Sequence, residues 1–153
     1  MVGPGLRSTN PQKESLAKII VFGANGRTGR IIVAKALEAG HEVTAAVRNP
    51  EAFSDFHPST RGSEKLHVVK ADVNSPASVH AAVRGMNAAI SAIGTGRKPN
   101  GLYSNGTRVI VNALIAEHVQ RFICISSGGV YHDDPNLLVQ GGRKGAGTRS
   151  MAG

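Results

Sequence analysis

The sequence predicts an α/β fold: a doubly wound parallel sheet with strand order 3-2-1-4-5. Short apolar runs alternate with stretches of helical period between residues 16 and 136. The runs are continuously apolar rather than alternating, which indicates strands of a parallel sheet covered on both faces. Right-handed crossovers between such strands give the order 3-2-1-4-5, the Rossmann arrangement.

The length of 153 residues predicts one domain with a sizeable core. We expect this domain over 16–136, with a flexible tail over 1–15 and a Gly-rich basic tail over 137–153. No stretch approaches the roughly 20 apolar residues of a membrane span, and the N-terminus lacks a signal-peptide core. The single cysteine, Cys124, excludes an internal disulfide and is expected to be a small core residue. These features indicate a cytoplasmic protein without a membrane partner.

The charge balance favours an anionic small molecule as partner. Lys and Arg exceed Asp and Glu by 18 − 10 = 8. Nucleic acid is the alternative, but the basic residues are scattered, and only four Phe, two Tyr and no Trp are present to stack on bases. We therefore expect no nucleic-acid partner.

The first unit contains the main motif. A strand over 17–22 is followed by Gly23, Gly26 and Gly29, and then by a helix from Arg30 that ends at Gly40. Strand, glycine turn and helix form the context of a dinucleotide-binding loop. The glycines would permit a tight turn, close approach of a pyrophosphate, and close packing of the helix on the strand. The spacing G-x-x-G-x-x-G is not the usual one, so a turn without a ligand is the alternative. No Gly-Lys-Ser/Thr follows, which excludes a P-loop.

The later elements follow the same alternation. Ser75 suits a helix N-cap with proline behind it, and Ile110, Ala113 and Leu114 share one helical face. We expect strands over 41–47, 66–70, 87–93 and 121–126, helices over 76–84 and 104–118, and a loop with at most one helical turn over 51–65.

Two arginines are candidate phosphate ligands. Arg48 ends the second strand, with no acid before Glu51, and a basic residue there accommodates the 2′-phosphate of NADP(H). Arg27 opens the first helix, where a cation opposes the helix dipole unless an anion binds. A solvated surface charge is the alternative for each.

Other candidates follow the remaining strands, whose carboxyl ends form the ligand crevice of this fold. Asp72 would accept a hydrogen bond from an adenine amine, or else stabilise a turn. Gly94 and Thr95 would approach the nicotinamide ribose, with an ordinary turn as the alternative. Ser126 would hydrogen-bond a substrate carbonyl or the nicotinamide amide. No Gly-x-Ser-x-Gly surrounds it, which argues against a hydrolase.

Taken together, these residues resemble the atypical short-chain dehydrogenase/reductase superfamily, in particular the biliverdin reductase B / flavin reductase group and NmrA-like NAD(P)H-binding proteins. The resemblance covers residues 18–135. It is carried by Gly23-Ala-Asn-Gly-Arg-Thr-Gly29, Val47-Arg48-Asn49, Ala71-Asp72-Val73, Ala92-Ile-Gly-Thr95 and Ile125-Ser126-Ser127.

The resemblance implies a Rossmann fold, NADPH as cofactor, and hydride transfer to a flavin or another planar acceptor. It does not require a Tyr-x-x-x-Lys pair, and none follows Tyr131. No metal is expected, because residues 132–134 suit a solvated turn. Ser126 is the expected catalytic residue. The expected cofactor-binding residues are Gly23, Asn25, Gly26, Arg27, Thr28, Gly29, Arg48, Asp72, Val73, Ile93, Gly94 and Thr95.

The C-terminal stretch departs from the resemblance. The family continues for several dozen residues that supply much of the substrate pocket, whereas this sequence turns Gly-rich and basic, so it looks shortened. Two alternatives to a reductase remain: a non-catalytic NADP(H)-binding redox sensor, and a shortened member with little activity. The apolar fifth strand would be a sheet edge and predicts a homodimer, unless residues 137–139 fold back over it.

Overall fold

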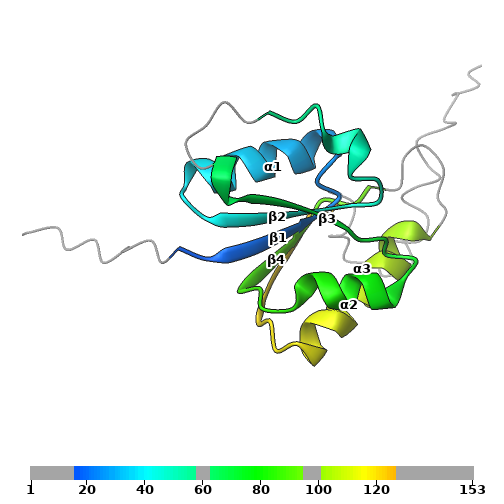
Figure 1. Ribbon diagram of the computed structural model, residues 1–153. Helices are drawn as coiled ribbons and strands as arrows, with labels where there is room; N and C mark the ends of the chain where they lie inside the picture. Colours follow the sequence, from blue (N-terminus) through cyan, green and yellow to red (C-terminus); the bar gives the residue numbers. More distant parts are fainter. Residues whose placement is uncertain (1–15, 58–62, 95–100, 127–153) are drawn as a thin grey trace, which may run out of the picture.

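The computed structural model describes residues 16–57, 63–94 and 101–126. Within them, five parallel strands form one sheet in the order β3-β2-β1-β4-β5, with α1 on one face and α2 and α3 on the other (Figure 1). The strands are β1 (Lys18–Phe22), β2 (Glu42–Val47), β3 (Leu66–Lys70), β4 (Ala88–Ser91) and β5 (Arg121–Cys124). The helices are α1 (Arg27–Glu38), α2 (Pro76–Val83) and α3 (Leu102–Ala116). The loop predicted over 51–65 contains two short 3₁₀ turns, η1 (Glu51–Phe53) and η2 (Ser63–Lys65), rather than at most one.

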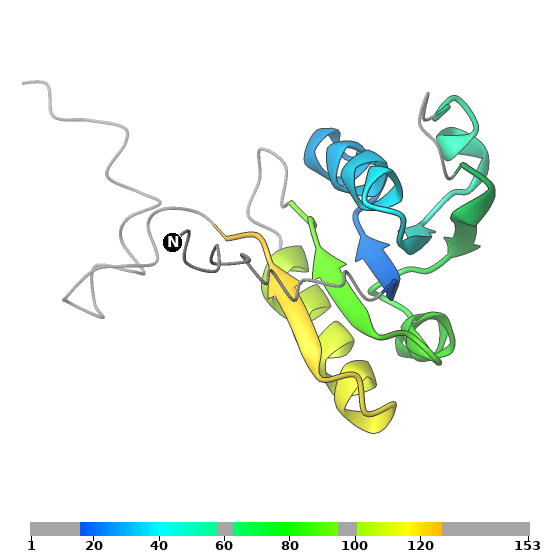
Figure 2. The same ribbon diagram turned by 90° about the vertical axis from the view of Figure 1, so that its left-hand side faces the viewer.

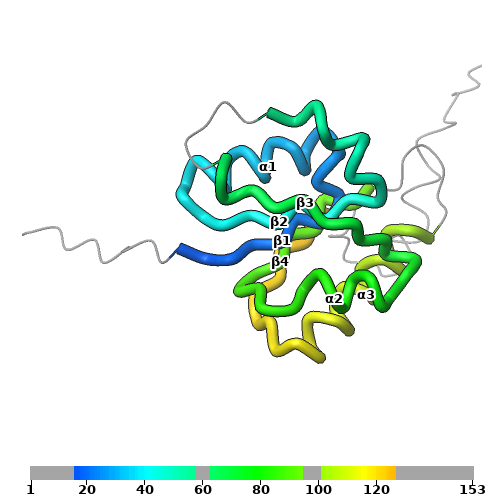
Figure 3. The backbone as a smooth tube through the Cα atoms, viewed as in Figure 1, coloured from blue at the N-terminus to red at the C-terminus, as the bar shows by residue number. Residues whose placement is uncertain are grey.

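The register confirms the predicted topology. Ile20 in β1 pairs with Thr44 in β2 on one side and with Ala89 in β4 on the other. Figure 3 traces the chain from β1 through α1 to β2, and after β3 through α2 to β4 on the opposite face. The direction of winding therefore changes between β1 and β4, which is the switch point where ligands bind in this fold.

Two apolar clusters fill the space between the sheet and its helices. On one face, Val21 and Val43 pack with Val33 and Leu37 of α1. The cluster on the other face joins Ile20 and Phe22 to residues of α2 and α3. The predicted inward face of the last helix is confirmed, because Ile110, Ala113 and Leu114 are buried in this second cluster.

Helix starts differ from the predictions. α1 begins at Arg27, three residues before the expected Arg30, because Gly26 is the N-cap and its carbonyl already accepts from the Arg30 N–H at 2.9 Å. α3 begins at Leu102 rather than residue 104, directly after Gly101 in a left-handed conformation. Ser75 occupies the N-cap position of α2, as predicted, but makes no side-chain capping hydrogen bond.

The outer strands are less covered than their apolar sequences predict. Val68 in β3 is 41% exposed, and Ile123 in β5 is 51% exposed. Both belong to the row of residues that runs across the sheet beside Val21, on the face of α1. One helix covers the middle of that face, and Figure 2 shows β5 at the margin of the described sheet. The prediction that helices cover both faces of the sheet is therefore confirmed for the central strands and wrong for the outer ones.

No helix in the described part of the chain combines the length and apolar character needed to cross a membrane.

Candidate functional site

A cavity of about 470 Å³ lies at the carboxyl ends of the central strands. The glycine loop after β1 lines one wall through Gly23, Asn25 and Gly26. The end of β2, the strand next to β1, lines the cavity through Arg48 and Asn49. Further lining comes from Ala52, Ala71, Val73, Ile93, Gly94 and Leu102. The volume is in the usual range of small-molecule sites, and the position is the switch point of the sheet.

Two glycines give the loop its shape. Gly23 has φ +73°, and a Cβ there would lie 2.8 Å from the carbonyl oxygen of Ala92. A Cβ on Gly29 would lie 2.1 Å from the carbonyl oxygen of Gly23. No side chain fits either position without moving backbone. The predicted tight turn and close helix packing are therefore confirmed, whereas the approach of a pyrophosphate at Gly26 stays a prediction.

The start of α1 suits an anion. Gly26 is its N-cap, no side chain caps it, and its first turn contains no acidic residue. The first N–H groups of a helix have no partner within it and carry a partial positive charge. Arg27 and Thr28 are exposed in this first turn but lie outside the cavity lining. Their contact with a cofactor stays a prediction.

Arg48 is exposed at the rim of the cavity. Its guanidinium makes no hydrogen bond or ion pair with any described residue. The neighbouring Asn49, which the sequence analysis did not select, lines the cavity and accepts a hydrogen bond from the Glu51 N–H at 3.1 Å. The turn after β2 is thus stabilised by a hydrogen bond between its own residues. The guanidinium of Arg48 remains available to bind an anion.

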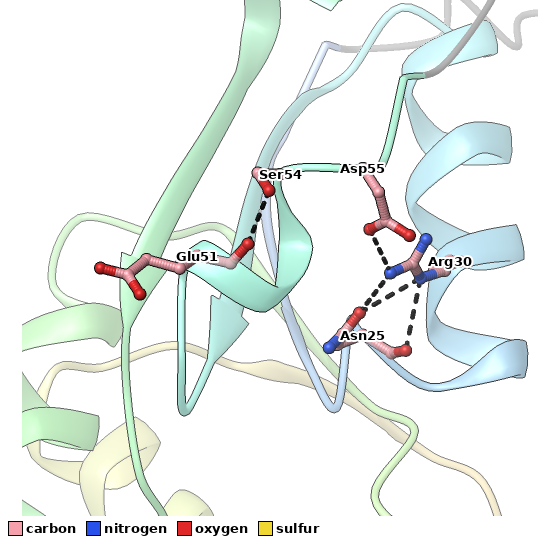
Figure 4. Close-up of polar contacts among 5 residues, drawn as sticks. All are labelled: Asn25, Arg30, Glu51, Ser54 and Asp55. Carbon is pink, nitrogen blue, oxygen red and sulfur yellow. Dashed lines mark hydrogen bonds and ion pairs between the residues drawn. The ribbon is translucent and has the colours of Figure 1, made fainter.

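Arg30 joins the glycine loop to the segment after β2 (Figure 4). Its guanidinium donates to Oδ1 of Asn25 at 2.6 Å and to Oδ1 of Asp55 at 2.7 Å. It also lies over the rings of Phe53 and Phe56, at 5.5 and 5.8 Å from their centroids. The hydrogen bond from Arg30 lowers the pKa of Asp55 below its usual value. These contacts join residues 5 to 26 positions apart, so no local sequence pattern indicated them.

Asp72 lies in the turn after β3. Its Oδ1 accepts from the backbone N–H of Asn74 at 2.9 Å and from the Asn74 side chain at 3.1 Å. Its own N–H donates to Oγ of Ser78 at 3.0 Å. Asp72 does not line the cavity, although Val73 does. The turn-stabilising alternative matches this geometry, and a contact with adenine stays a prediction.

The ends of β4 and β5 form the other side of the crevice. Ile93 and Gly94 line the cavity, and Thr95 lies outside the described residues. Ser126 is exposed just beyond β5 and is not part of the cavity lining. Its predicted place beside a nicotinamide stays a prediction.

A tyrosine that the sequence analysis did not select lies beside Ser126. The Tyr103 hydroxyl, in the first turn of α3, donates to the carbonyl of Ile125 at 3.0 Å and lies 3.2 Å from Sγ of Cys124. The contact with the thiol, together with burial, raises the pKa of Tyr103 above its usual value, and a hydrogen bond with Ser126 acts in the opposite direction. Cys124 is half-buried at this contact rather than enclosed in the core.

The described residues bring no three His, Cys, Asp or Glu side chains together as candidate metal ligands.

Comparisons with known proteins agree with this geometry. Residues 23–148 match the NAD(P)H-binding family. Cinnamoyl-CoA reductase 1 of Oryza sativa subsp. japonica is 29% identical over 123 residues, which cover 77% of this chain and 36% of the rice enzyme. Dihydroflavonol 4-reductase of Zea mays is 37% identical over 70 residues, covering 44% of this chain and 20% of the maize enzyme.

Among solved structures, vestitone reductase from alfalfa (Medicago sativa L.) superposes with a TM-score of 0.63 at 29% identity, covering 74% of this chain and 37% of that enzyme. The chain thus spans little more than a third, or less, of each of these relatives. The predicted fold and resemblance to NAD(P)H-binding reductases are confirmed, and a nicotinamide dinucleotide is the ligand class of the family. The chain belongs to the NAD(P)H-binding family.

Proposed function

We propose that this protein binds NADPH in the cavity at the switch point and passes hydride from it to a flavin or a similar planar acceptor. The observation that carries the proposal is the cavity itself, which is lined by a glycine loop and by Arg48, whose guanidinium has no partner among the described residues. The cofactor would supply the hydride, and the acceptor would take up a proton from solvent. The protein's own groups then bind and orient the two partners.

The residues present fit a dinucleotide. Gly23 lets the loop turn sharply, and Gly26 opens α1 without a capping side chain, so backbone N–H groups remain for a diphosphate. Arg48 would meet a 2′-phosphate, since guanidinium binds phosphate through paired hydrogen bonds. The family match alone includes both NADH and NADPH. Arg48 is the reason to favour NADPH.

The reductase assignment draws on the relatives. The rice, maize and alfalfa proteins are each named as reductases, of cinnamoyl-CoA, dihydroflavonol and vestitone. The flavin-type acceptor rests on the resemblance of the motifs to the flavin reductase group. Ser126 would then hydrogen-bond the nicotinamide amide or the acceptor from the end of β5.

A non-catalytic NADP(H) sensor is the second candidate. The position of Ser126 favours it, because this serine is exposed and lies outside the cavity lining. Such a protein would bind the cofactor at the glycine loop without holding an acceptor beside it.

The cofactor test is a fluorescence titration of the full chain with NADPH and with NADH. We expect tighter binding of NADPH. Arg48→Glu should weaken NADPH by about 1–3 kcal/mol, the scale of a hydrogen bond to a charged group, and leave NADH unchanged. Arg121→Glu is the matched control, because it makes the same charge change at the opposite end of the sheet. Equal affinity of the parent protein for both cofactors would contradict the NADPH assignment.

The activity test follows NADPH absorbance against a panel of acceptors that includes FMN. A reductase oxidises NADPH faster when a planar acceptor is added. A sensor binds NADPH and shows no turnover with any acceptor in the panel.

A further inference from the structure

Arg30 contacts Asn25, which lines the cavity, but does not line the cavity itself. It is in the first turn of α1, and its side chain is 29% exposed. The segment that it contacts, around Asp55, follows Arg48 and Asn49 within the same crossover. Arg30 therefore links the glycine loop to the segment that follows the proposed phosphate ligand in the chain.

The hydrogen bonds of Arg30 determine how the Asn25 amide is oriented. Nη2 and Nε of Arg30 donate to Oδ1 of Asn25 at 2.6 and 3.2 Å, and Nε also faces the Asn25 carbonyl at 3.4 Å. A guanidinium has donors only, so the amide must turn its oxygen toward it. Figure 4 shows the amide nitrogen of Asn25 on the side away from Arg30. Asn25 also lines the cavity, and its amide nitrogen is the side-chain polar atom that the contacts with Arg30 leave for a ligand.

This orientation matters for an anionic ligand. A diphosphate presents acceptor oxygens only, so an amide N–H₂ attracts it and an amide oxygen repels it. The two orientations of Asn25 have nearly the same shape and differ in the atom that the ligand meets. Arg30 selects the orientation that presents a donor.

The aromatic contacts fix the guanidinium plane. Phe53 and Phe56 stack with centroids 4.8 Å apart, and the guanidinium of Arg30 lies over both rings. Such stacking suits a flat guanidinium better than a flexible ammonium group. The ion pair with Asp55 lies at the surface, where the acid side chain is 72% exposed, and exposed ion pairs contribute little to stability. The contacts therefore hold the geometry of Arg30 more than they stabilise the fold.

We propose that Arg30 is a positioning residue that orients the Asn25 amide toward the cofactor diphosphate. This inference rests on the proposed function, since it requires a dinucleotide in the cavity. It differs from the role of Arg48, because the diphosphate is common to NADPH and NADH.

The test compares Arg30→Met, Asn25→Ala and the double variant in titrations with NADPH and NADH. Arg30→Met should weaken binding of both cofactors equally, by up to about tenfold, the upper end of the usual contribution of a hydrogen bond. In the Asn25→Ala background the same change should have no further effect, because no amide is left to orient. A merely structural role would instead weaken binding equally in both backgrounds, which would overturn the proposal.

Asn25→Asp gives a second test that keeps the contact with Arg30. The carboxylate can accept from the guanidinium as the amide does, but its second oxygen faces the cavity. We expect this variant to melt at the parent temperature without ligand and to bind both cofactors more weakly than Asn25→Ala. Binding at parent strength would overturn the proposal.

Arg84→Met is the control, because Arg84 pairs with Glu117 on the face of α2 and α3 and should leave cofactor binding unchanged. If the parent protein binds neither NADPH nor NADH, the proposed function itself fails. If the parent binds and Arg30→Met binds equally well, only the positioning role fails.

Discussion

The two sides of the crevice are held in different ways. At the glycine loop, backbone contacts fix Gly23 and Gly29, and Arg30 links the loop to the segment after β2. At the ends of β4 and β5, no described residue lies within 4 Å of a Cβ added to Gly94, and Ser126 is exposed. Among the described residues, the loop side is therefore held by more contacts than the β4–β5 side. We therefore expect substitutions to separate cofactor binding from turnover.

The largest effect is expected for Gly29→Ala. The new Cβ would lie 2.1 Å from the carbonyl oxygen of Gly23, so α1 must move away from the loop. We expect destabilisation of about 3 kcal/mol, the upper part of the usual range for overpacking, and loss of cofactor binding. Thermal melting and NADPH titration measure the two effects.

Gly94→Ala is the matched control on the other side of the crevice. No residue in the described part of the chain lies within 4 Å of its new Cβ, and the φ of Gly94 is outside the left-handed region. Its stability should change by less than about 0.5 kcal/mol. Equal destabilisation by the two substitutions would show that the loop side is no more tightly packed than the β4–β5 side.

Ser126→Ala tests the β4–β5 side directly. We expect turnover with a planar acceptor to fall about tenfold, which corresponds to the loss of one hydrogen bond in the transition state. The dissociation constant of NADPH should change less than about twofold, because the loop side is untouched. A variant that loses affinity and turnover in equal proportion would place Ser126 in cofactor binding instead.

Ile123→Lys tests the margin of the sheet. Within the described residues, β5 has β4 as its hydrogen-bonded neighbour, and Ile123 is 51% exposed. An apolar edge invites pairing with a second copy, and a lysine there opposes it. We predict that the parent chain dimerises and that the variant shifts toward monomer in light scattering. A parent protein that stays monomeric at every concentration would exclude this homodimer.

Apart from the Gly94→Ala control, the smallest effect is expected for Tyr103→Phe. The hydroxyl of Tyr103 holds the carbonyl of Ile125, and its loss should cost about 1 kcal/mol or less. Because the folded pKa is raised above 10.0 by the Cys124 contact and by burial, the neutral phenol favours the folded state. This contribution is present below pH 10 and is lost as the pH rises through the folded pKa. The variant should therefore show a shallower stability loss above pH 10 in denaturant melts.

The sequence predicted those features of the protein that are formed by residues close together in the chain. The strand, glycine turn and helix from β1 to α1 are contiguous, so their glycines could be interpreted directly. The contact of Arg30 with Asp55 spans 25 positions and depends on a crossover without helical period, so it required the structure. The same holds for Tyr103 and Ile125, which are 22 positions apart.

The exposure of side chains in the outer strands could not be predicted from the sequence either. β5 is as apolar as a central strand, and its burial depends on what covers its place in the sheet rather than on its own residues. The start of α1 at Arg27 was missed for another reason. The sequence pattern does not show which glycine of the loop ends the turn and begins the helix. In the structure Gly26, the second glycine, is the N-cap of α1.

Because Arg48 is exposed, we expect the preference for NADPH over NADH to depend on the ionic strength of the solution. Mobile ions screen charges at a surface over about 8 Å at physiological ionic strength and over about 3 Å in 1 M salt. The attraction between Arg48 and a 2′-phosphate would therefore weaken as the salt concentration rises. The backbone N–H groups after Gly26 would contact the diphosphate, which both cofactors share. A concentrated salt solution would therefore narrow the difference between NADPH and NADH without removing binding of either.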